Sequence, residues 1–104
     1  MQDTKMIEIN EQYVLKQAID VFGMDMQLNV AVEELSELTK EICKYKRGNK
    51  NLSNIIEEMA DCYIMLDQIR IMFELGSTVI KDKIHEKIER LYKRIEKCKK
   101  GGAE

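Results

Sequence analysis

Proline is absent from this chain of 104 residues, and glycine occurs only five times. Both residues interrupt helices, so their scarcity leaves room for long and uninterrupted ones. Glu, Lys, Leu, Ile and Met are abundant instead, and all of them tolerate a helical backbone well. Because the length is that of one domain, we expect a single all-α domain over residues 1–104.

Cysteine and histidine are also scarce. There are three cysteines, at no Cys-x-x-Cys spacing, and one histidine, His85. This set disfavours a zinc site, and an odd number of thiols disfavours a disulfide framework. Three reduced thiols are typical of a cytoplasmic protein, which is the location we expect.

The chain has no basic excess and no long apolar run. It has 17 basic and 19 acidic side chains, for a net charge of −2, which disfavours a nucleic-acid partner. The longest apolar run, 62–66, is far shorter than the roughly 20 residues that span a bilayer. The first residues also lack the basic and then apolar pattern of an export signal, so we expect no membrane partner.

What the sequence does contain is apolar residues at helical spacing. Steps of three and four residues predict four helices, at about residues 6–22, 26–46, 53–75 and 78–99. Ser53 is the expected N-cap of the third helix, and Ser77 or Thr78 that of the fourth. Because the connections are short, we expect a four-helix antiparallel bundle.

The third predicted helix is unusually apolar. Between Met59 and Phe73 the strongly polar residues are only Asp61, Asp67, Gln68 and Arg70, so the helix needs cover on most sides. A domain this short hides only about two-thirds of its unfolded-chain surface. We therefore expect homo-oligomerisation to complete the bundle, as a homodimer or a homotetramer, between which the sequence does not decide.

Two pairs of acids mark the second and third predicted helices. Glu34 and Glu37 lie within AVEELSEL, and Glu58 and Asp61 lie within NIIEEMAD. Residues three apart share a helix face, and both pairs lie just beside the apolar stripe, so antiparallel packing could bring them together. Four crowded carboxylates favour a hard divalent cation, Mg²⁺ or Mn²⁺. The alternative is that these acids are ordinary solvated surface residues.

With Glu34 and Glu37 followed at a suitable spacing by Glu58 and Asp61, the sequence resembles the MazG-like family of all-α nucleoside triphosphate pyrophosphohydrolases. The family pattern is Glu-x-x-Glu, a spacer and Glu-x-x-Asp, and the resemblance covers roughly residues 28–95. It implies Mg²⁺ bound by these four carboxylates and a nucleoside triphosphate as substrate. We therefore expect a monophosphate and pyrophosphate as products, with water attacking the α-phosphorus, in a housecleaning role.

The residues leave some roles open. Glu33 and Glu37 are both candidates for the general base. On the fourth predicted helix, Lys83, Lys87 and Arg90 are candidates for binding substrate phosphates, although they could equally form ordinary surface pairs. Two other functions remain possible: phosphoribosyl-ATP pyrophosphohydrolase of histidine biosynthesis, and a non-catalytic helical interaction module. The preferred base or sugar is not indicated.

Overall fold

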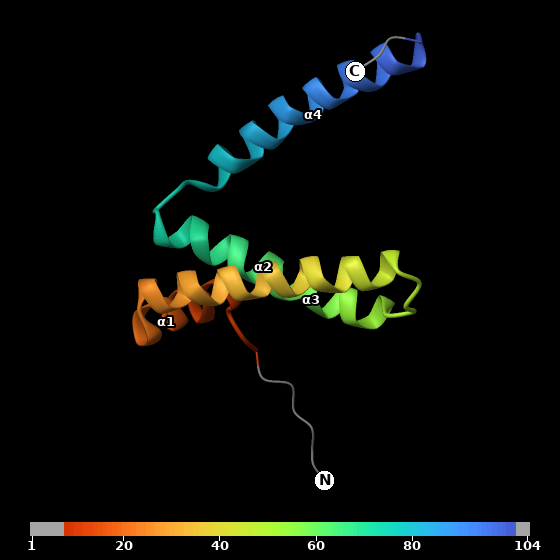
Figure 1. The fold of residues 1–104 in the computed structure, drawn as a ribbon. Helices are drawn as coiled ribbons and strands as arrows, with labels where there is room; N and C mark the ends of the chain where they lie inside the picture. The colour runs from red at the N-terminus through yellow and green to blue at the C-terminus, as the bar shows by residue number, and fades with distance from the viewer. Residues whose placement is uncertain (1–7, 102–104) are drawn as a thin grey trace. The chain divides into compact units, whose positions relative to one another are not determined.

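A computed structural model describes residues 8–101 of the chain (Figure 1). Four helices follow one another, and there is no strand within that range. They are α1 (Glu11–Phe22), α2 (Met24–Lys46), α3 (Leu52–Met72) and α4 (Ser77–Lys99). The all-α class and the number of helices agree with the prediction. Among the described residues, none of the helices is long and apolar enough to cross a membrane.

The first helix begins later than predicted. Residues 8–10 are not helical, and residues 6 and 7 of the predicted span lie outside the described residues. Asn10 ends the non-helical stretch because its side-chain oxygen accepts a hydrogen bond from the main-chain N–H of Tyr13, at 3.1 Å. This N-cap fixes the start of α1 at Glu11, so the predicted start at residue 6 was wrong.

The other helix ends either coincide with the prediction, as at residues 22, 46 and 99, or differ from it by one to three residues. α2 begins at Met24 rather than 26, directly after Gly23. α3 begins at Leu52, so Ser53 is not its N-cap, and it ends at Met72 rather than 75 because Glu74 takes a positive φ of 54°. α4 begins at Ser77 with Gly76 as N-cap, so neither Ser77 nor Thr78 has that role.

The chain divides into two compact units. The first, Met1–Phe73, contains α1, α2 and α3, and each of these helices contacts the other two. The second, Glu74–Glu104, contains the amphipathic helix α4. In Figure 1, α2 and α3 run side by side over most of their length. The candidate site lies between these two helices.

The core of the first unit combines apolar and polar side chains. Ala31, Cys62 and Met65 are its buried apolar residues, and Gln27 and Gln68 are buried beside them. The amide of Gln27 donates to the side-chain oxygen of Gln68 at 2.8 Å. Gln68 in turn donates to the main-chain carbonyl of Leu15 at 3.2 Å. One hydrogen-bonded chain therefore joins α2, α3 and α1, and it satisfies polar groups that burial would otherwise make costly.

One face of α3 is not covered within the first unit. Met59, Leu66 and Tyr63 are 42%, 54% and 68% exposed. With residues of α2, they line an apolar groove of about 260 Å³, whose walls are Leu35, Leu38, Met59, Cys62, Tyr63 and Leu66. The expectation that α3 is covered on most sides is thus not met by α1 and α2 alone.

Candidate metal centre

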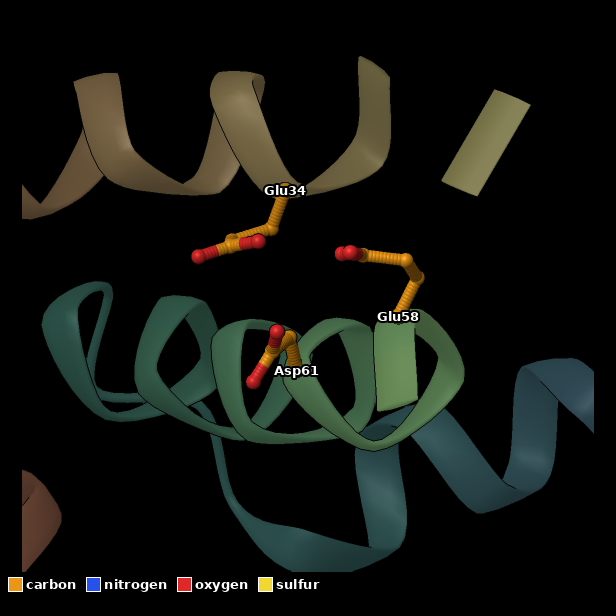
Figure 2. Close-up of side chains that lie close together, drawn as sticks. All are labelled: Glu34, Glu58 and Asp61. Carbon is orange, nitrogen blue, oxygen red and sulfur yellow. The ribbon is translucent and has the colours of Figure 1, made fainter. Parts of the chain in front are cut away.

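Three of the four predicted acids lie together between α2 and α3. Glu34 comes from α2, and Glu58 and Asp61 come from successive turns of α3 (Figure 2). One carboxylate oxygen of each lies within 4.8 Å of the others. Figure 2 shows the three side chains pointing into the same space between the two helices. The spacing of the acids along each helix and the antiparallel packing together produce this convergence.

A contact between the helices lies next to the cluster. The thiol of Cys62, the residue after Asp61, donates to the main-chain carbonyl of Glu34, with 3.5 Å between sulfur and oxygen. Cys62 is only 6% exposed, so α2 and α3 approach closely at this level. The backbone of Glu34 is therefore held against the turn of α3 that carries Asp61.

Burial and like charge both act on Glu34. Partial burial raises the pKa of its carboxyl above the ordinary value of 4.5. The charge of Asp61 raises it further, followed by those of Glu58, Glu33 and Glu37. Ionised Glu34 is thus opposed by its surroundings, and a cation held among these acids would reverse that effect.

Glu58 is in a similar position. Burial, then the charges of Asp61 and Glu37, raise the pKa of its carboxyl above 4.5. Its Oε1 atom is buried, and no described residue gives it a hydrogen bond. Buried carboxylate oxygens are normally paired, so this atom lacks a partner that a cation could supply.

The donor set fits a hard cation. The three side chains offer only carboxylate oxygens, which suit Mg²⁺, Mn²⁺ or Ca²⁺ and do not suit soft metals. Mg²⁺ is bound by few protein carboxylates and keeps water or phosphate oxygens for the rest of its coordination. A group of three half-buried carboxylates is compatible with this coordination.

The other predicted site residues lie outside this group. Glu37 is exposed and is not among the three converging acids, although its charge acts on both Glu34 and Glu58. Glu33 is exposed, and its charge also raises the pKa of Glu34. The fourth ligand and the general base both stay predictions.

The three predicted phosphate-binding residues all lie on α4. Lys83, Lys87 and Arg90 follow one another at steps of four and three residues, so they share a face of that helix. The ammonium of Lys83 forms an ion pair with Glu86, at 2.9 Å. This pair is an ordinary exposed surface contact, and the phosphate role stays a prediction.

Sequence reasoning overlooked Glu41, one of the most buried acids. Its carboxylate forms an ion pair with Lys44 at 3.4 Å. Its main partner, however, is Asn51, whose amide donates to Glu41 Oε1 at 2.7 Å and to the Glu41 carbonyl at 2.9 Å. Asn51 immediately precedes α3, so its contact with Glu41 depends on how the loop turns back onto α2. Helical spacing in the sequence does not predict such a contact.

Comparison with known proteins identifies no significant match. No family model matches the sequence, and no curated protein and no solved structure matches it significantly. The functional argument therefore depends on the residues and on their geometry.

Proposed function

We propose that the protein is a Mg²⁺-dependent nucleoside triphosphate pyrophosphohydrolase. The observation that supports this most is the convergence of Glu34, Glu58 and Asp61 from two helices, with Oε1 of Glu58 buried and unpaired among the described residues. An acidic group of this kind repels a triphosphate unless a divalent cation lies between them. The resemblance to the MazG-like pattern gives the proposed reaction.

Glu34, Glu58 and Asp61 would hold the cation, and Glu37 is the proposed fourth carboxylate. When bound, Mg²⁺ supplies positive charge to phosphate oxygens, on which negative charge increases as the phosphoanhydride is cleaved. Mn²⁺ is expected to substitute, because it accepts the same oxygen ligands. The partly buried setting of the three side chains limits the water that competes for the cation.

The remaining roles belong to residues around this group. Glu33 and Glu37, which are exposed near the three acids, are the candidates for accepting a proton from the attacking water. Lys83, Lys87 and Arg90 of α4 are the candidates for neutralising the phosphates. A basic side chain is needed for this, since the acids themselves repel the substrate.

Phosphorus NMR tests the reaction. The purified protein is incubated with Mg²⁺ and a panel of nucleoside triphosphates, and phosphoribosyl-ATP is included as a separate substrate. The expected products are pyrophosphate and a monophosphate. They should be lost in Asp61→Asn and retained in Glu57→Gln, which changes an exposed acid next to Glu58.

Each result has a definite meaning. Cleavage of phosphoribosyl-ATP alone would transfer the assignment to the histidine-biosynthesis activity. No product from any substrate, together with no thermal stabilisation by Mg²⁺ and nucleotide, would leave the non-catalytic helical module as the better explanation.

A homo-oligomer is the second part of the proposal. Two apolar surfaces are exposed: the groove between α2 and α3, and the apolar stripe along α4. We propose that α4 and a second copy of the chain complete a helical bundle in which both surfaces are buried. Light scattering at micromolar concentration should give a dimer or a tetramer. Tyr63→Glu, in the groove, should shift the mass towards the monomer, whereas Asn29→Glu, exposed on α2 and outside the groove, should not. A monomeric wild-type protein would contradict this part.

A further inference from the structure

The buried glutamine pair is separated from the acidic cluster by the same number of residues on both helices. Gln27 precedes Glu34 by seven residues on α2, and Gln68 follows Asp61 by seven residues on α3. Seven residues are close to two helical turns, so each glutamine lies on nearly the same face as the acid of its helix. The two helices are antiparallel, and Gln27 and Gln68 bond to each other at 2.8 Å. The glutamine pair and the Glu34–Asp61 pair are therefore successive layers of one interface.

A third polar layer lies on the other side of the acids. Glu41 follows Glu34 by seven residues, and Asn54 precedes Asp61 by seven. The amides of Asn51 and Asn54 both contribute to lowering the pKa of Glu41, and Asn51 bonds to it at 2.7 Å. The acidic cluster is thus flanked along the helices by one hydrogen-bonded layer at each end.

We propose that Gln27 and Gln68 are positioning residues, whose buried hydrogen bond fixes the register of α2 against α3 and so sets Glu34 opposite Asp61. The effect of the two glutamines on metal binding rests on the proposed function. Their effect on the register of the two helices does not depend on it.

The apolar contacts of the interface do not determine its register strongly. Ala31, Cys62 and Met65 are small or flexible, and a flexible methionine adapts to several neighbours. A buried polar pair is different, because any other alignment leaves an amide without a partner. Polar residues at interfacial heptad positions select one register of a coiled coil in this way.

The network also excludes sliding of the third helix. Gln68 is only 2% exposed, and its amide bonds to the carbonyl of Leu15 in α1 while its oxygen accepts from Gln27. Both ends of this one side chain are therefore used, by two different helices. Movement of α3 by one turn would break both bonds together.

Electron–electron distance measurement tests the register without a metal. Spin labels are placed on ketone-bearing residues introduced at the exposed positions Asn29 and Ser53, so the native thiols remain, and labelled protein is diluted with unlabelled protein. The two labels lie towards opposite ends of the hairpin, and a shift by one turn changes their separation by up to about 5 Å. The wild type should give one narrow distance distribution.

The key variant replaces both glutamines by methionine, which has a similar shape and no amide. Gln27→Met with Gln68→Met should keep its helix content but give a broad or double distribution. Gln17→Met, an exposed change on α1, is the matched control and should leave the distribution narrow. If the double variant fails to fold, Gln27→Met alone serves for the same measurement, because it leaves the bond from Gln68 to Leu15.

Binding of Mn²⁺ alone, followed by its EPR signal, tests the consequence for the acids. Loss of the glutamine pair should weaken Mn²⁺ binding on the order of tenfold, the low end for changes in groups that orient ligands. A distribution that stays narrow would overturn the inference, and so would a broad one with unchanged Mn²⁺ affinity. A broad distribution in a protein whose wild type binds no Mn²⁺ would refute the proposed metal site and support the register role alone.

Discussion

Cys62 donates a hydrogen bond from its thiol to the main-chain carbonyl of Glu34, so the cysteine of α3 lies directly against the helix turn that carries an acid of the candidate metal centre. The thiol is buried, and burial raises its pKa above the ordinary value of 9.0. The charges of Glu34, Glu58 and Asp61 raise it further. Cys62 is therefore held in the unreactive, protonated form.

This contact predicts unequal thiol reactivity. Cys43 and Cys98 are exposed, so iodoacetamide at pH 8 should alkylate them first. Alkylation of Cys62 should be at least about tenfold slower, because the thiolate is the reactive form and access is blocked. Peptide mass spectrometry over time measures all three rates, and in denaturant they should become similar. Equal rates in the folded protein would contradict the burial of Cys62.

The raised pKa of Glu58 predicts that this residue weakens the metal-free fold. Its ionised form is disfavoured by burial and by Asp61 and Glu37, so at neutral pH Glu58→Gln should raise the melting temperature without metal. The same change should reduce or remove the stabilisation that we expect Mg²⁺ to give to the wild type. Differential scanning fluorimetry with and without Mg²⁺ measures both effects.

The neighbouring Glu57 provides the control. Glu57→Gln removes an equal charge from an exposed side chain, and both melting temperatures should stay close to those of the wild type. A metal-free Glu58→Gln protein that melts below the wild type would show instead that Glu58 has a structural partner.

The bond between Asn51 and Glu41 predicts a pH-dependent stability. The Asn51 amide, and then the charge of Lys44, hold the pKa of the Glu41 carboxyl below the ordinary 4.5. A lowered pKa means that the unfolded chain binds the proton more readily, so this stabilisation is complete above pH 4.5 and is lost as the pH falls through the lower, folded-state pKa. Asn51→Ala should therefore be less stable than the wild type at pH 7.

Urea denaturation at several pH values checks this prediction. The difference in unfolding free energy between Asn51→Ala and the wild type should narrow steadily below pH 4.5. Asn49→Ala, in the same connection but exposed, should show no such trend. A difference that is independent of pH would mean that Asn51 stabilises the loop without acting on Glu41.

The connection between α1 and α2 predicts a strict need for glycine. Gly23 alone joins the two helices, with φ 93° and ψ 148°, a conformation that other residues rarely adopt. Gly23→Ala should cost about 1–3 kcal/mol of unfolding free energy. Gly76 also precedes a helix, but its φ is −66°, so Gly76→Ala should change stability much less. Equal losses in the two variants, measured by urea denaturation, would contradict the strain at Gly23.

Much of the hairpin that bears the site could be predicted from the sequence. The spacing of the apolar residues predicted the C-terminal end of α2 correctly at residue 46, because a long amphipathic pattern identifies the face of the helix that is buried. The three-residue spacing also predicted that Glu58 and Asp61 share a face, and they do converge with Glu34. These features depend only on helical geometry and on antiparallel packing.

Other features depend on contacts that spacing does not encode. The start of α1 is set by one hydrogen bond, which the Asn10 side-chain oxygen accepts from the main-chain N–H of Tyr13, and the periodic apolar pattern does not reveal it because it extends further towards the N-terminus. Glu37 is exposed and is not among the three converging acids, although the same three-residue spacing brings Glu58 and Asp61 together, so spacing alone does not determine which acids converge. The hydrogen bonds between Asn51 and Glu41 require the connection before α3 to turn back onto α2, which is a tertiary event.

The short connection between α2 and α3 has a consequence for folding. Only five residues, 47–51, separate these helices, so the hairpin closes a small loop and should form early. Its formation brings Glu34, Glu58 and Asp61 together, which makes like-charge repulsion part of the barrier to docking. A divalent cation bound there would therefore speed refolding as well as serve the folded protein, and metal supply would influence how quickly the newly made chain matures.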